Sequence, residues 1–195
     1  MAEAGGQGPV RPRVLIDACV LYPSVLREIV TGCAAAGLFV PHWSPRILAE
    51  WAHAAGRLGP EGAATAADAI LRLRAAFPAA EVLPDARIEA ALDLPDAADR
   101  HVLAAAIAAG AGVLLTRNLR DFPRRALAPH GIAAESPDDF LMRLWLAEPA
   151  PVEAVIAGVQ AETERASGRA QPLRAMLKRA GLPRLGRALQ PPGPP

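Results

Sequence analysis

Short apolar segments that alternate with helix-type patterns constrain the fold of this chain more than any other feature. Residues 14–16 have the pattern of a buried strand, and the helical spacing that follows in SVLREIVTGCAAAG ends at a cap near Gly37. LFVPHWS predicts a second short strand, and residues 113–116 predict another after a helix over 97–109. Strands that alternate with helices form a parallel sheet covered on both faces, so we expect an α/β fold.

Further elements carry start or stop signals. Ser44 followed by Pro45 predicts a helix start, because serine caps the first turn and proline fits its first position. An alanine-rich helix is expected over 61–76, and Pro78 would end it. AEVLP predicts a short strand, HGIAAE an edge strand, and SPDDFLMRLWLAE a helix that opens on Ser-Pro.

The chain of 195 residues has room for one domain and an appendage. We expect a flexible leader over 1–12, because this stretch lacks the apolar middle of a secretion signal. One α/β domain is expected over 13–148. A basic extension of one or two helices follows over 149–190, and PPGPP at 191–195 is expected to be a disordered tail.

Composition excludes several function classes. No run of about 18 uncharged apolar residues occurs, so no membrane span is expected. Cys19 and Cys33 lie in apolar segments without metal-binding spacing, which favours buried thiols in a reducing cytoplasm over a disulfide. The histidines are scattered, and His42 and His101 are expected to fill local polar niches, so neither zinc binding nor Cys–His catalysis is supported.

Acidic side chains follow two of the expected strands. Asp17 comes directly after residues 14–16, and Asn118 and Asp121 follow residues 113–116. In open parallel sheets, ligands bind outside the carboxyl ends of the strands, so these positions share one edge. Glu50 lies on the apolar side of its expected helix and can face the same edge.

Asp96 and Asp99 occupy the first turn of the helix that precedes 113–116, which brings further acids to this region. Clustered carboxylates raise each other's pKa unless a cation joins them. Mg²⁺ and Mn²⁺ prefer such oxygen-rich sites, and their natural chemistry is hydrolysis of phosphodiesters. The pattern therefore favours a metal-dependent phosphodiester hydrolase.

Most of these residues also have a purely structural interpretation. Asp96 and Asp99 are good residues for a helix N-terminus. Asp121 suits a turn, Asn118 a left-handed turn position, and Glu50 a partly exposed helix surface. Asp17 points to function most strongly, because apolar runs on both sides of it predict burial.

In four blocks, VLIDACVL, SPRILAEW, DAADRHVLAAAIAAGAGVLLT and TRNLRDF, the chain resembles the PIN-domain nucleases, and in particular the VapC-like toxins of bacterial toxin–antitoxin pairs. The resemblance spans residues 14–144 and implies a three-layer α/β/α fold with a central parallel sheet. It also implies that 13–148 is a PIN-like nuclease domain and that 149–190 exceeds a minimal toxin.

The resemblance assigns roles to individual residues. Four acids match the metal-binding and catalytic positions of the family: Asp17, Glu50, Asp99 and Asp121. Asp96 supports them, and Thr116 and Asn118 match neighbours that orient ligands or water. Many members carry Asn two residues after the first Asp, whereas this chain has Cys19.

The resemblance also implies an activity and partners. The family activity is Mg²⁺- or Mn²⁺-dependent endoribonuclease cleavage of RNA, and VapC-like members form homodimers silenced by a cognate antitoxin. A stand-alone RNA-processing nuclease and a non-catalytic RNA- or partner-binding module remain alternatives. An aspartate-nucleophile phosphatase would need a second Asp where Cys19 stands, and a plain structural domain leaves the acids unexplained.

Basic residues offer two places for RNA phosphates. Arg117 and Arg120 flank the expected site, where they either hold phosphates or are solvated loop charges. From Arg165 onward the chain has seven basic and no acidic residues. This arm could track an RNA backbone, its leucines could pack on the body or on a partner helix, or it could be a solvated tail.

Overall fold

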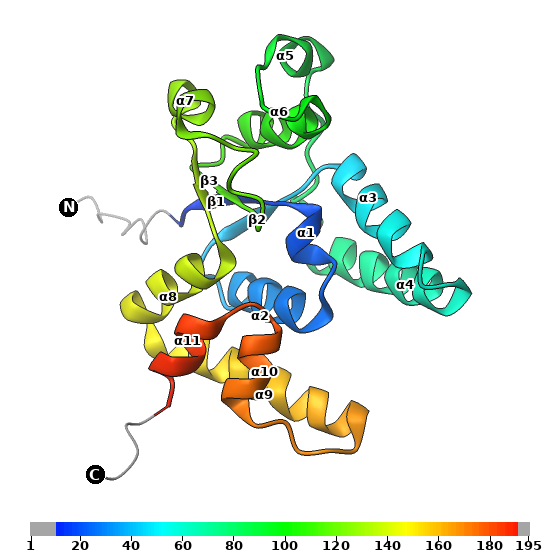
Figure 1. Ribbon diagram of the computed structural model, residues 1–195, viewed down its shortest axis with the longest axis vertical. Coiled ribbons are helices and arrows are strands. Elements are labelled where there is room, and N and C mark those ends of the chain that lie inside the picture. Colours follow the sequence, from blue (N-terminus) through cyan, green and yellow to red (C-terminus); the bar gives the residue numbers. More distant parts are fainter. Residues whose placement is uncertain (1–10, 191–195) are drawn as a thin grey trace, which may run out of the picture.

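Within residues 11–190, which the computed structural model describes, four strands pair in one parallel sheet (Figure 1). The sheet order is β2–β1–β3–β4. The strands are β1 Arg13–Ile16, β2 Val40–His42, β3 Val113–Leu115 and β4 Ala133–Glu135. The edge position of β4 confirms the edge strand expected from HGIAAE. Val14, at the centre, pairs with Pro41 on one side and Val113 on the other, and it is fully buried.

Helices cover both faces of the sheet, which confirms the three-layer α/β/α arrangement (Figure 1). Helices α5 and α6 lie over one face, and α2 and α8 lie over the other. Helix α3 packs against both α1 and α4 at one side of the sheet. The helices of the body are α1 Ala18–Leu21, α2 Ser24–Ala35, α3 Pro45–Gly56, α4 Pro60–Ala76, α5 Ala86–Ala91, α6 Arg100–Ala109, α7 Arg124–Leu127 and α8 Pro137–Ala147.

The helix boundaries follow the capping signals in the sequence. The Ser44 hydroxyl accepts a hydrogen bond of 3.3 Å from the Ile47 N–H at the start of α3. Ser136 plays the same role at α8. Gly110 ends α6 in the left-handed conformation, with φ of 58°, which glycine adopts without steric cost.

Two expectations for the body of the protein need correction. The segment AEVLP forms only an isolated bridge between Glu81 and Trp43, since prolines at 78 and 84 leave too few consecutive residues for a ladder. The helix expected over 97–109 begins as a 3₁₀ turn, Ala97–Asp99, and becomes α-helical only at Arg100.

The C-terminal extension forms three helices, not one or two: α9 Pro149–Ser167, α10 Leu173–Arg179 and α11 Pro183–Ala188. Helix α9 packs against α2 and α8, and α11 packs against α8 (Figure 1). The extension buries the apolar side chains Met176, Leu177, Leu182 and Leu185. The apolar side chains therefore pack on the body, and the interpretation as a solvated tail is wrong. The domain boundary at 148/149 stays a prediction.

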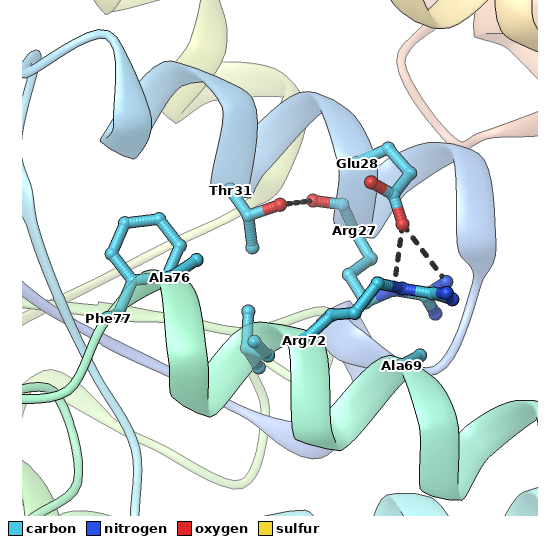
Figure 2. Close-up of a pocket in the computed structure, with 8 residues that line it drawn as sticks. Arg27, Glu28, Thr31, Ala69, Arg72, Ala76 and Phe77 are labelled. Atoms are coloured by element: carbon cyan, nitrogen blue, oxygen red, sulfur yellow. Dashed lines mark hydrogen bonds and ion pairs between the residues drawn. The ribbon is translucent and has the colours of Figure 1, made fainter.

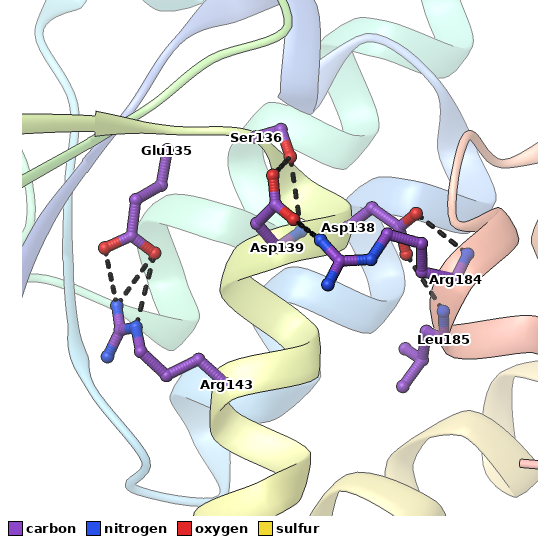
Figure 3. A network of polar contacts seen from close by, with 7 residues as sticks. All are labelled: Glu135, Ser136, Asp138, Asp139, Arg143, Arg184 and Leu185. Atoms are coloured by element: carbon purple, nitrogen blue, oxygen red, sulfur yellow. Dashed lines mark hydrogen bonds and ion pairs between the residues drawn. The ribbon is translucent and has the colours of Figure 1, made fainter. Parts of the chain in front are cut away.

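A buried carboxylate fastens the extension to the body. Asp138, in the first turn of α8, is 8% exposed and accepts hydrogen bonds from the N–H groups of Arg184 at 2.9 Å and Leu185 at 3.0 Å (Figure 3). These N–H groups belong to the first turn of α11 and have no partner inside that helix. Asp138 thus caps a helix that lies far from it in sequence, and the Arg184 side chain adds an exposed ion pair with Asp139.

The expected leader and tail lie mainly outside the described residues, which exclude 1–10 and 191–195. Of the leader, Arg11 pairs with Glu148, and the Pro12 carbonyl accepts a hydrogen bond of 2.9 Å from the Val40 N–H. Among the described helices, none is long and apolar enough to cross a membrane.

A hollow of about 150 Å³ lies between α2 and α4 (Figure 2). Its wall includes Arg27, which is only 9% exposed. The Arg27 guanidinium donates to the Leu21 carbonyl at 2.9 Å and to the Glu28 carboxylate, and it lies 4.8 Å from the centre of the Trp51 ring. Its charge is thus satisfied within the protein, and none of the predicted site acids lines the hollow.

Candidate active site

Asp17 stands where β1 ends and α1 begins. Its backbone N–H donates to the Leu115 carbonyl at 3.0 Å, so the last residue of β3 helps to position it. The residue is 7% exposed, as the flanking apolar runs predict. Thr116 donates to Oδ2 of its carboxylate at 2.7 Å, and the Cys19 thiol donates to the same oxygen at 3.0 Å. Among the described residues, no hydrogen bond reaches Oδ1.

The Cys19 thiol links the loops after β1 and β3. Besides donating to Asp17, its sulfur accepts a hydrogen bond of 3.2 Å from the Arg117 N–H. Burial, followed by the negative charge of Asp17, raises the pKa of the thiol to about 12. The thiol is therefore protonated at neutral pH and acts as a hydrogen-bond donor to Asp17.

Glu50 projects from α3 and contacts α6. Its Oε1 lies 2.8 Å from Nε2 of His101 and 3.6 Å from Nε of Arg46, which are the closest approaches of these two side chains to Glu50. Burial, followed by the charge of Arg46, lowers the pKa of His101 to about 4. The imidazole is therefore neutral at pH 7, and it contacts Glu50 as an uncharged ring.

Asp96 and Asp99 have different environments although they share a turn. The Asp96 carboxylate accepts a hydrogen bond of 2.8 Å from the Ala98 N–H, so its structural interpretation as a cap is confirmed. Asp99 makes no capping bond. The pKa of Asp99 is raised to about 6, mainly by burial and then by the charges of Asp17, Asp121 and Asp96 in that order.

The remaining candidates lie on the loop after β3. Asp121 is half-buried, and its N–H donates to the Asn118 carbonyl at 3.1 Å in a turn. Asn118 also donates its N–H to the Thr116 hydroxyl at 3.0 Å. Arg117 and Arg120 are exposed, and neither forms an ion pair with another described residue.

The structure brings the predicted acids within electrostatic reach of one another. The pKa of Glu50 is raised, mainly by burial. The charge of Arg46 opposes this shift, whereas the charges of Asp17 and Asp99 add to it. Asp121 acts in the same way on Asp99. Four carboxylates from α3, the start of α6 and the ends of β1 and β3 thus share one region, where neighbouring charges destabilise the charged forms of Glu50 and Asp99.

The donor set fits a hard divalent cation in its chemistry, since it consists of carboxylates, and no hydrogen bond from a described residue reaches Oδ1 of Asp17 or Oε2 of Glu50. The side chains of residues 11–190 do not, as they stand, form a group of three or more His, Cys, Asp or Glu that could hold a metal ion.

Two contributors to the site were missed in the sequence. His101 was expected to fill a polar niche, whereas it contacts Glu50. The position of His101, two residues after Asp99, could have indicated that it lies near the site. Arg46, four residues before Glu50 on the same helix face, could have been found from its spacing.

Comparisons with known proteins agree with this architecture. A family model described as PIN domain matches residues 13–120. A protein of Mycobacterium tuberculosis named "Putative ribonuclease VapC50" is 53% identical to this chain over 62 residues, which is 31% of this chain. The match covers only 36% of that relative's length. A search of the solved structures finds no significant match.

Proposed function

This chain belongs to the PIN domain family, and on that premise we propose that it is a ribonuclease that hydrolyses RNA phosphodiester bonds with Mg²⁺ or Mn²⁺. The observation that carries the proposal is that the charges of neighbouring acids raise the pKa of Glu50 and of Asp99. Such repulsion is costly unless a cation offsets it. The similarity to a protein named as a ribonuclease supports RNA as the substrate.

Asp17, Glu50, Asp99 and Asp121 would hold the metal. A bound divalent cation neutralises phosphate charge and makes water more acidic, which favours attack of a water oxygen on phosphorus. Hydrolysis consumes one water for each P–O bond that breaks, with the attacking and leaving oxygens roughly in line.

The chain's own residues prepare this reaction. Thr116 and Cys19 fix Asp17 through Oδ2, so its other oxygen points away from these donors. Asp96 holds the turn that carries Asp99. In this proposal the exposed Asn118 would orient water or ligand, and the exposed Arg117 and Arg120 would bind phosphates.

Replacement of the first acid tests the proposal. The variant Asp17→Asn keeps the side-chain volume but removes the charge, so RNA cleavage in Mg²⁺ should fall by more than about 100-fold, beyond the loss typical of an outer-shell change. Asp68→Asn, on the exposed side of α4, is the matched control and should cleave like wild type. Undiminished cleavage by the Asp17 variant would exclude the proposed role.

We further propose that the protein is the toxin of a toxin–antitoxin pair, acting in the cytoplasm as a homodimer that a cognate antitoxin silences. The name of the relative supports this assignment. A small reading frame directly upstream that encodes a DNA-binding protein would be the expected companion. Without one, a stand-alone RNA-processing nuclease becomes the better assignment, and inactive wild-type protein would favour a non-catalytic binding module.

The basic extension is a second candidate surface for RNA. Arg174 and Lys178 are exposed on α10, while the neighbouring Leu177 is fully buried. Removal of the extension would therefore disturb the core, and charge substitution is the better test. Replacing both basic residues with Gln should reduce the salt dependence of RNA binding by about one unit of slope per lost phosphate contact, and an unchanged slope would rule out this surface.

A further inference from the structure

His101 is a buried histidine, and its two ring nitrogens have different surroundings. It is 2% exposed, and its Nε2 lies 2.8 Å from Oε1 of Glu50. Its Nδ1 is buried and has no hydrogen-bond partner among the described residues. An unpaired buried polar atom lowers stability and calls for a functional explanation.

His42 shows what a purely structural histidine looks like in this protein. It is buried to the same 2%, but its Nδ1 lies 3.2 Å from the Ala80 carbonyl, and its Nε2 accepts a hydrogen bond of 3.2 Å from Arg13. Both ring nitrogens of His42 are thus satisfied by groups that hold β2 in place. His101 differs, because its single polar contact is with a predicted metal ligand.

The contacts of Glu50 favour one of its oxygens. The closest approaches of His101 and of Arg46 are both to Oε1. Asp17 follows a similar pattern, since Thr116 and Cys19 both donate to Oδ2. In each acid, groups of the protein lie closest to one carboxylate oxygen, and no hydrogen bond from a described residue reaches the other.

We propose that His101 is a positioning residue, which holds Oε1 of Glu50 so that Oε2 is presented to a divalent cation. This inference rests on the proposed function. The buried imidazole suits the role better than Arg46, because Arg46 is about half exposed and shares its guanidinium with Glu89 at 3.0 Å. Partners that orient a ligating carboxylate commonly set its metal affinity.

Variants of the full chain, titrated with Mn²⁺ alone in a calorimeter, test the proposal. His101→Leu keeps much of the volume and removes the donor, so the Mn²⁺ dissociation constant should rise by about 10- to 100-fold. His101→Gln retains an N–H donor and should stay within about threefold of wild type. His42→Leu is the matched control and should bind Mn²⁺ like wild type. The proposal is overturned if His101→Leu binds within about twofold of wild type, or if His42→Leu loses as much affinity.

A measurement on the wild-type protein keeps the proposal testable if His101→Leu does not fold. The imidazole nitrogen resonances should identify the Nε2–H form of His101 and should shift as Mg²⁺ saturates the protein. The His42 resonances should not follow. An unmoved His101 signal at saturating Mg²⁺ would overturn the positioning role while leaving the ribonuclease proposal intact. Wild-type protein that binds neither ion would instead overturn the ribonuclease proposal itself, and the positioning role with it.

Discussion

The Thr116 hydroxyl donates a hydrogen bond of 2.7 Å to Oδ2 of Asp17 and thereby joins the ends of β1 and β3. Thr116 is fully buried, and its oxygen also accepts a bond of 3.0 Å from the Asn118 N–H. One hydroxyl thus orients the first acid and fixes the loop that carries Asp121. The sheet holds Asp17 and this loop in place, because they follow the adjacent strands β1 and β3.

We predict that Thr116→Val disrupts both functions of this hydroxyl with little change in shape. Mn²⁺ affinity and RNA cleavage should each fall by about 10- to 100-fold. The free energy of unfolding should fall by about 1–2 kcal/mol, because Asp17 loses a donor and Asn118 loses an acceptor. Calorimetry, cleavage assays and denaturant unfolding measure the three effects. Thr116→Ser keeps the hydroxyl and should stay near wild type; equal activity of the Val and Ser variants would refute the prediction.

The pKa of Asp99, raised to about 6 from an ordinary value of 3.8, predicts a pH-dependent stability. The folded state binds this proton more tightly than the unfolded state. The contribution of Asp99 is therefore fully present below about pH 4 and is lost as the pH rises through about 6. In Asp99→Asn this loss should disappear, so at about pH 8 the metal-free variant should be more stable than wild type by up to about 1 kcal/mol, since partial exposure screens the repulsion.

Thermal unfolding of both proteins at about pH 4 and pH 8 measures this difference. At the lower pH the two proteins should unfold at similar temperatures. Addition of Mn²⁺ at about pH 8 should reverse the order, because wild type gains binding energy that the variant lacks. A variant that is less stable than wild type at about pH 8 without metal would show that Asp99 is not destabilised by its neighbours.

The parts of the site that follow a strand could be predicted from the sequence, because a strand fixes where its last residue lies. Asp17 and the loop from Thr116 to Asp121 needed only the strand positions and the parallel topology. Capping rules could not distinguish Asp96 from Asp99, since both suit a helix N-terminus, and only the family resemblance favoured Asp99 as the ligand. Which of them caps the turn depends on the 3₁₀ geometry of Ala97–Asp99.

Contacts between separate helices could not be predicted from the sequence. The pairing of His101 with Glu50 depends on how α3 and α6 approach one another, which no local pattern encodes. The position of α11 likewise depends on Asp138, whose place near the start of α8 suggests only a favourable interaction with its own helix. Apolar periodicity shows that a helix buries a face, but not which surface it covers.

Asp138 provides a direct test of how the extension is held. We predict that Asp138→Ala lowers the free energy of unfolding by about 1–3 kcal/mol, because two N–H groups of α11 lose their acceptor in a buried setting. Hydrogen exchange of the Arg184 and Leu185 amides should accelerate. Asp139→Ala removes an exposed ion pair with Arg184 and an exposed hydrogen bond of 2.7 Å from the Ser136 hydroxyl, and should cost only about 1 kcal/mol. Similar losses in both variants would contradict the capping role.

The contact of α2 with α9 predicts an unusual response to alanine at Gly32. A Cβ atom there would lie 2.6 Å from Cγ1 of Val155, a side chain with little freedom to move. Gly32→Ala should therefore lower the free energy of unfolding by about 1–3 kcal/mol, although alanine favours helices. Gly158→Ala, on α9 with no atom within 4 Å of its Cβ, should instead stabilise the protein by about 0.5–1 kcal/mol. Denaturant unfolding measures both, and Val155→Ala should rescue the Gly32 variant. If Gly32→Ala proved as stabilising as Gly158→Ala, α9 could not be packed this closely on the body.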